Sequence, residues 1–285
     1  MDIIKAIASE LNVRNNQVEA AVKLIDEGCT IPFISRYRKE ATGALNDEQL
    51  RNLDERLKYL RNLEDKKTQV IASIAEQGLL TDELKNQIEK ADTMVAVEDL
   101  YRPYRPKRRT RATIAKEKGL EPLANIIMLQ MTGEPVVKTA EEYVSEEKDV
   151  KTPEDAVAGA KDIIAESISD NADYRTRIRE LTFKEGVLTS AAKDAEAKTV
   201  YEMYYNFSEP AAKMAGHRIL AVNRGENEKI LTVKIEAPVD KILAYLEKQI
   251  IVRDNQYTTG IIKEAIEDSY ERLIAPSIER EIRNQ

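Results

Sequence analysis

Cysteine, histidine and tryptophan are nearly missing from this sequence of 285 residues, which has one cysteine, one histidine and no tryptophan. The single Cys29 excludes a disulfide within the chain, and Cys29 and His217 are too few to build a clustered soft-ligand metal site. We therefore expect no metal, no cofactor and a reducing environment. Glycine and proline are also sparse, at 10 and 9 residues, and this composition argues against an all-β fold with many tight turns.

Long apolar runs and the common catalytic motifs are missing as well. No stretch approaches the roughly 18 apolar residues of a membrane span, and the N-terminus lacks the features of a signal peptide. We therefore expect a cytoplasmic protein with no membrane partner. The patterns GxxxxGK[ST], GxGxxG, HExxH, CxxC and GxSxG do not occur. Because no acids have metal-binding spacing either, we expect no enzymatic activity, and interpret His217 as a structural residue.

The residues that are present favour long, solvent-exposed helices, since 42% are hydrophobic and 33% are charged, with both signs interspersed. Ile3, Ile4, Ile7 and Leu11 recur at helical spacing, and a second apolar face follows up to a turn at Gly28. Two short helices of this kind resemble a helix-turn-helix, although they are also the most ordinary way to pack helices.

A long helix is the clearest single element that the sequence predicts. Asn46 can cap its start together with Gln49, and leucines from Leu50 to Leu60 then form one apolar stripe. If the helix continues to Gln77 it is about 45 Å long, although KKTQ at 66–69 interrupts the stripe and permits a bend. Residues 29–45 before it are interpreted as a connector, because Pro32 interrupts the pattern.

The second half is predicted to be helical with one small β element. Thr152 and Pro153 form a good helix start. Residues 229–236 alternate like a strand, whose partner we expect within 199–207 or 218–223. The fold class is therefore mainly α, with a helix-turn-helix-like pair, one long helix and a small antiparallel β-hairpin. We expect three segments, 1–78, 79–150 and 151–285, of which the last reads as leading into a further domain.

Residues 101–112, YRPYRPKRRTRA, carry six cations and no acid, although the formal net charge of the chain is -7. Pro103 and Pro106 disfavour a helix and predict that the cations lie on a loop or an extended, polyproline-like ribbon. Cations on such a ribbon could neutralise phosphates while tyrosine rings stack on bases. The same cations could equally pair with acids of neighbouring helices, so this alternative stays open.

A smaller basic cluster with the same composition surrounds Tyr37. The candidate nucleic-acid-binding residues from both stretches are Arg36, Arg38, Lys39, Tyr101, Arg102, Tyr104, Arg105, Lys107, Arg108, Arg109 and Arg111.

Four segments resemble, in this order, the N-terminal part of the Tex family of bacterial transcription accessory proteins: IPFISRYRKEATGAL, VEDLYRPYRPKRRTRATIAKEKGLEPLA, SEPAAKMAGHRILAVNRGENEKIL and RLIAPSIEREIR. The resemblance covers essentially the whole chain. It implies a helical front half that begins with a helix-turn-helix-like element. In the family, this part is followed by an RNase H-like domain, helix-hairpin-helix modules and an OB-fold.

The resemblance also implies a cytoplasmic, nucleic-acid-binding protein tied to transcription, with no established catalytic activity. The signature residues of the family fall here on 102–111 and on His217, Arg218, Arg224 and Gly225. The sequence ends where the RNase H-like domain is expected, so the OB-fold credited with the main nucleic-acid affinity is not expected in this chain.

Two hypotheses from different classes follow for the function. The first is a non-catalytic module that contributes sequence-independent binding to RNA or DNA through the basic ribbon. The alternative is a protein interaction scaffold for polymerase, ribosome or downstream domains, in which the basic ribbon pairs with acids of its own fold and does not touch nucleic acid.

Overall fold

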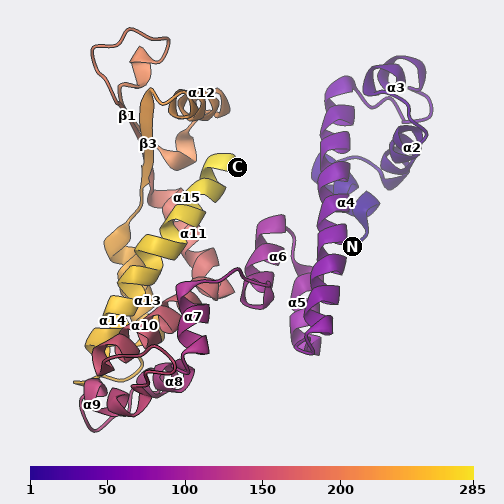
Figure 1. Cartoon of the computed structure of the whole chain (residues 1–285). Coiled ribbons are helices and arrows are strands. Elements are labelled where there is room, and N and C mark those ends of the chain that lie inside the picture. Colours follow the sequence, from indigo (N-terminus) through magenta and orange to yellow (C-terminus); the bar gives the residue numbers. More distant parts are fainter. The chain divides into compact units, whose positions relative to one another are not determined.

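The computed structural model describes residues 1–285, and the chain divides into two compact units, Met1–Tyr104 and Arg105–Gln285. Helices dominate both units (Figure 1), which confirms the predicted mainly α class. The only sheet has three antiparallel strands. No helix combines the length and the apolar character that crossing a membrane requires.

The first unit is built on one long helix, α4 (Asp47–Glu76), which confirms the predicted strut. Asn46 caps it by accepting a hydrogen bond from Gln49 N at 2.8 Å. The helix continues without interruption through KKTQ, where Lys67 occupies the stripe position and is 3% exposed. Its Nζ donates to Glu89 O at 2.9 Å and to Glu64 at 3.2 Å, so the buried ammonium is satisfied.

Shorter helices pack around α4 and share one apolar core with it. The pair α1 (Ile3–Leu11) and α2 (Asn15–Asp26) confirms the two predicted N-terminal helices, and Gly28 follows the end of the second one with φ +88°. The other helices of this unit are α3 (Ile31–Tyr37), α5 (Asp82–Lys90), α6 (Met94–Tyr101) and a 3-10 helix, Arg102–Tyr104.

The predicted connector at 29–45 is wrong over its first half, where α3 forms. Thr30 caps this helix by accepting a hydrogen bond from Phe33 N at 3.4 Å. Pro32 lies in the first turn, where a missing N–H costs no helical hydrogen bond. The proline therefore starts the helix that it was expected to prevent.

The second unit is organised around α10 (Pro153–Asp170), whose start at Pro153 confirms the predicted cap. Thr152 accepts the hydrogen bond of Asp155 N at 3.1 Å. The other helices are α7 (Arg111–Glu117), α8 (Glu121–Leu129), α9 (Val136–Ala140), α11 (Ala172–Glu185), α12 (Gly216–Asn227), α13 (Val239–Ile250), α14 (Thr259–Asp268) and α15 (Ala275–Asn284), with a π-helix, Ser269–Ile274, between the last two, and 3-10 helices at Glu141–Tyr143, Glu202–Tyr204 and Ala211–Lys213.

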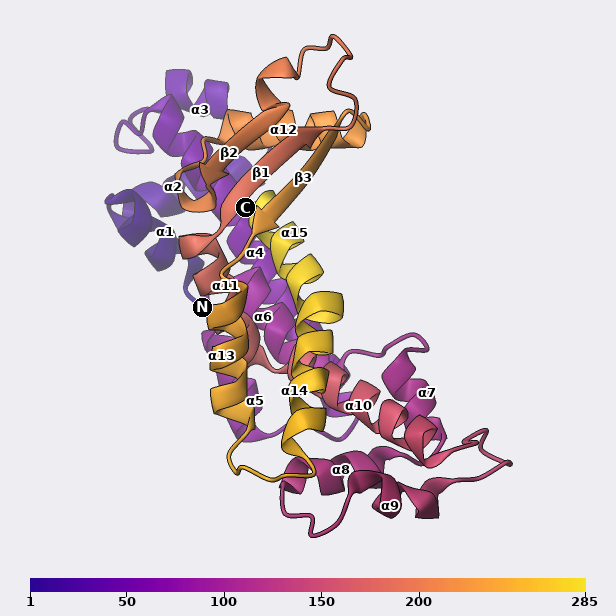
Figure 2. The ribbon, with the colours of Figure 1, turned by 90° about the vertical axis from the view of Figure 1, so that its left-hand side faces the viewer.

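The sheet differs from the predicted hairpin. Strand β3 (Leu231–Glu236) forms where a strand was expected, but its partner is β1 (Val187–Ala192). On its other side β1 pairs with β2 (Asn206–Pro210), so the order is β2-β1-β3 (Figure 2). The expected partner segment 218–223 is helical, and 199–207 contributes only the start of β2. Small and hydroxyl residues in β1 carry no alternating apolar pattern, which explains the error.

The boundary between the two units does not coincide with the expected segments. It falls between Tyr104 and Arg105, inside the basic run. Residue 150 lies within the second unit, where α7, α8 and α9 all pack on α10. The segments 1–78, 79–150 and 151–285 stay a prediction about separable domains.

Gly225 of α12 packs against Leu231, the first residue of β3, and it provides a test of the packing. A Cβ there would lie 2.5 Å from Leu231 Cδ1 and 3.1 Å from Tyr201 Cδ1, and both residues are buried. We expect Gly225→Ala to lower the free energy of unfolding by about 1–2 kcal/mol, because overpacking outweighs the gain in helix propensity. Urea denaturation measures this change.

Gly260→Ala in α14 is the matched control, since nothing lies within 4 Å of its Cβ position. It should leave stability unchanged or raise it by up to about 1 kcal/mol. Equal stability of the two variants would contradict the packing described here.

Candidate nucleic-acid interface

The basic run 101–112 is not the continuous extended ribbon that its prolines predict. Arg102–Tyr104 is a 3-10 helix, and Arg111 is the first residue of α7. Only residues 105–110 lie outside regular helices. The expectation is therefore wrong at both ends, because a proline is compatible with the first turn of a helix as well as with an extended path.

The two tyrosines of the run pack against the core of the first unit. The Tyr101 hydroxyl lies 2.9 Å from Ser73 Oγ, and Tyr104 O accepts a hydrogen bond from Gln77 at 2.8 Å. Both side chains are half-buried, as is Arg102. The ring faces predicted to stack on bases are thus partly covered within their own unit.

Lys107 is held by carboxylates of its own unit. Its Nζ donates to Glu166 at 3.0 Å and also to Asp170, one turn further along α10. The side chains of all three residues are at most 22% exposed. For Lys107, the alternative that the basic run pairs with internal acids is therefore the correct one.

Arg111 lies in the field of the same acidic face of α10. Burial raises the pKa of Asp162, and the charges of Arg272 and Arg111 oppose that rise. A hydrogen bond from Arg272 lowers the pKa of Asp268, and the charge of Arg111 lowers it further. Arg111 thus contributes to a mixed cluster of acids and arginines although it makes no close ion pair.

The remaining cations of the run, Arg105, Arg108 and Arg109, are exposed. Arg109 lies 3.6 Å from Glu117, but both side chains are more than 60% exposed, and such a pair contributes little. Arg108 makes no ion pair. Arg108 and Arg109 are therefore open to solvent, while Lys107 is bound internally.

The smaller basic cluster at the end of α3 is more open. Arg36, Arg38 and Lys39 are all exposed, and none of them makes an ion pair. Tyr37 among them is 66% exposed, and Phe33, one turn earlier, is 41% exposed. We call these five residues the α3 patch. Sequence reasoning missed Phe33, although its i, i+4 spacing from Tyr37 was a usable signal.

The backbone beneath the α3 patch is fixed although its side chains are free. Gln17 Nε2 in α2 donates to Gly43 O at 3.0 Å and to Thr42 O at 3.3 Å. Thr42 is fully buried and donates its hydroxyl to Arg38 O at 3.2 Å. Gly43 has φ +63°, and a Cβ there would lie 2.7 Å from Gln17 Nε2, so the loop needs glycine at this point.

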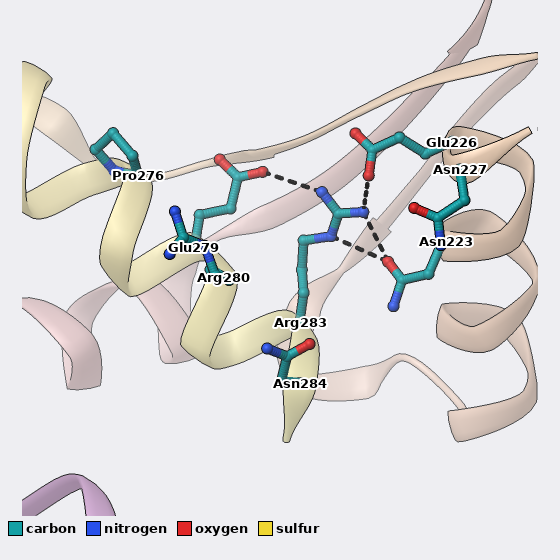
Figure 3. Close-up of a pocket in the computed structure, with 8 residues that line it drawn as sticks. All are labelled: Asn223, Glu226, Asn227, Pro276, Glu279, Arg280, Arg283 and Asn284. Atoms are coloured by element: carbon teal, nitrogen blue, oxygen red, sulfur yellow. Dashed lines mark hydrogen bonds and ion pairs between the residues drawn. The ribbon is translucent and has the colours of Figure 1, made fainter. Parts of the chain in front are cut away.

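A polar hollow of about 450 Å³ lies between α12 and α15 (Figure 3). Its central Arg283 donates to Asn223 Oδ1 at 2.7 and 3.1 Å and to Glu226, and lies 3.6 Å from Glu279. The hydrogen bonds and ion pairs of this guanidinium link α12 to α15 and leave it unavailable to a ligand. Arg280 is the one remaining cation that lines the hollow, so the site carries no excess positive charge.

Two of the four signature residues in α12, Arg218 and Gly225, make contacts within the fold. Arg218 forms an ion pair with Glu209 at 3.0 Å, and Gly225 lies against Leu231. His217 and Arg224 are exposed. No group of three or more histidine, cysteine, aspartate or glutamate side chains is arranged to hold a metal ion.

Comparison with known proteins places both units in one family. Residues 1–75 match the family described as Tex-like protein N-terminal domain, and residues 132–285 match Tex central region-like. The chain is 52% identical over 282 residues to the uncharacterized protein YdcI of Bacillus subtilis, covering 98% of this chain and 39% of that protein.

Two further relatives have informative names. The chain is 38% identical to the transcriptional accessory protein Tex of Neisseria gonorrhoeae, covering all of this chain and 38% of the relative. It is 28% identical to the human S1 RNA-binding domain-containing protein 1, covering 99% of this chain and 30% of the relative. The chain thus spans well under half the length of these relatives.

Lys107 is bound by two carboxylates, whereas its neighbour Arg108 is exposed and makes no ion pair. Substituting each residue tests this difference. We expect Lys107→Met to lower the free energy of unfolding by about 1–3 kcal/mol, because the half-buried Glu166 and Asp170 carboxylates lose the ammonium that both of them contact. Arg108→Met should change it by less than about 0.5 kcal/mol. Equal effects in thermal or urea unfolding would show that the ion pairs do not stabilise the unit.

Proposed function

The chain belongs to the Tex family, and on this premise we propose that it contributes sequence-independent binding of RNA or DNA to a transcription accessory protein, without catalysing a reaction. The names of its relatives in Neisseria gonorrhoeae and in humans support an association with transcription and with RNA. We further propose that it acts in the cytoplasm, where a chain with one cysteine needs no disulfide.

The α3 patch is the observation that carries this proposal. Three exposed cations without ion-pair partners lie within four residues of an acidic chain. Cations in this state can neutralise phosphates and release counterions from a nucleic acid. Because phosphates are the same in every sequence, contacts of this kind position the nucleic acid without reading its bases. Arg108 and Arg109 offer a second, smaller phosphate contact.

A second candidate function, as a protein interaction scaffold, is favoured by a rigid apolar surface in the second unit. Gln130 is buried, donates to Ile250 O at 2.8 Å and accepts hydrogen bonds from Val252 N and Arg253 N. The two loops joined in this way lie together in Figure 2. They expose Leu129 and Met131, each 65% accessible, and Val252, 71% accessible. Such a surface would suit polymerase, ribosome or further domains of the same protein.

Charge reversal tests the nucleic-acid proposal. We expect Arg36→Glu, Arg38→Glu and Lys39→Glu together to abolish retention of labelled single-stranded and duplex oligonucleotides at low salt. The matched control is Lys23→Glu, Lys85→Glu and Lys90→Glu, which changes the net charge equally at three exposed lysines of the same unit. Equal loss of retention in both variants, or no loss in the first, would contradict binding through the α3 patch.

Charge reversal at the exposed arginines of the basic run distinguishes the two candidate functions. Reversal of Arg108 and Arg109 to Glu should weaken retention and leave the melting temperature unchanged if these residues contact phosphates. A lower melting temperature with unchanged retention would instead support the scaffold.

A further inference from the structure

Two aromatic rings are exposed on the same face of α3 and pack only against each other. Phe33 and Tyr37 lie one turn apart, with ring centroids 5.3 Å apart and planes inclined by 46°. Between them in sequence, Ile34 is fully buried and anchors the helix in the core. The helix thus places its aliphatic side chain in the core and leaves two aromatic side chains in solvent.

Other aromatic side chains of the first unit are used differently. Tyr59 and Tyr101 pack against the core, and their hydroxyls bond to Met94 N and Ser73. Tyr37 has neither a hydrogen bond nor a place in that core. Large apolar surface left exposed on a rigid element usually marks a contact site.

The charges around the rings decide what kind of partner fits. Arg36, Arg38 and Lys39 flank Tyr37, and Glu40 is the only acid within residues 30–45. The end of a helix exposes carbonyl oxygens that would repel an anion. At this end Ile34 O accepts from Arg38 N, and beyond the helix Arg38 O accepts from Thr42 and Lys39 O from Ala44 N. Three cations and one acid next to the rings therefore favour an anionic partner.

We propose that Phe33 and Tyr37 form a stacking site for an unpaired base, while Arg36, Arg38 and Lys39 hold the flanking phosphates of the same strand. This inference rests on the proposed nucleic-acid function and adds a preference to it. Phosphate contacts alone do not distinguish a single strand from a duplex. Bases within a duplex are stacked on each other, so an aromatic ring on a protein surface can cover only a base that is free of the duplex.

Loss of the rings tests this preference. We expect Phe33→Ala with Tyr37→Ala in the full 285-residue chain to raise the Kd for a labelled oligouridylate by about 5- to 100-fold. The Kd for a blunt duplex of equal length should not change, because the cations remain. Phe33→Tyr with Tyr37→Phe keeps two rings and should bind the single strand like the unchanged protein. Thermal unfolding of each variant checks that the first unit remains folded.

The outcomes separate this inference from the proposed function. An unchanged Kd for the oligouridylate, or equal weakening for single strand and duplex, would overturn the stacking site and leave phosphate binding in place. Failure of the unchanged chain to bind either nucleic acid would overturn both.

A second measurement locates the base directly and does not depend on the folding of a variant. Irradiation of the unchanged chain with an oligonucleotide that contains 5-iodouridine should attach the base to Tyr37 or Phe33, as identified by mass spectrometry of the cross-linked peptide. Cross-links confined to peptides outside α3 would contradict the assignment.

Discussion

The ion pairs of Lys107 with Glu166 and Asp170 determine which part of the basic surface remains open to a polyanion. A cation held between two carboxylates at low exposure would have to give up both ion pairs before it could bind a phosphate, which is costly. Arg111 is drawn to the same acidic face of α10. Part of the most basic stretch of the sequence therefore stabilises the second unit through ion pairs. Fewer of its cations are available to bind a nucleic acid than its net charge indicates.

The α3 patch has the opposite combination of properties. Its cations have no carboxylate partners, while its backbone is held by Gln17 and by the buried Thr42. A fixed backbone reduces the conformational entropy that binding must remove, so each contact contributes more to affinity. An exposed group is useful for binding when it is both free of internal partners and presented in a constant position.

Most of the fold could be predicted from local sequence signals. The cap at Asn46 and the leucine stripe define α4, and Thr152 with Pro153 defines the start of α10. The predictions were wrong where a local sequence signal fits two structures, or where a segment carries no local signal. Pro32 could either begin or block a helix, and only its position after the cap Thr30 decides. Strand β1 has no apolar alternation, since its place in the sheet depends on pairing with β2 and β3.

The residue types of the candidate site could be predicted from the sequence, but their ion pairing and exposure could not. The sequence identified the cations of both clusters, yet the partners of Lys107 lie 59 and 63 residues away on α10, beyond the reach of any local pattern. Exposure of Phe33 and Tyr37 likewise depends on which face of α3 packs on the core. Tertiary contacts thus decide which charges are available, and composition alone cannot.

The dependence of binding on salt tests this account most directly, because its slope counts the phosphates that are neutralised. Replacing Arg36, Arg38 and Lys39 by glutamine should reduce the slope of log K against log salt for a single strand by about 2, at about 0.7 per phosphate. Lys107→Gln should leave the slope unchanged. A slope that is unaffected by the first substitution, or that falls with the second, would contradict this account, in which Lys107 pairs with carboxylates of its own unit and the α3 patch binds phosphates.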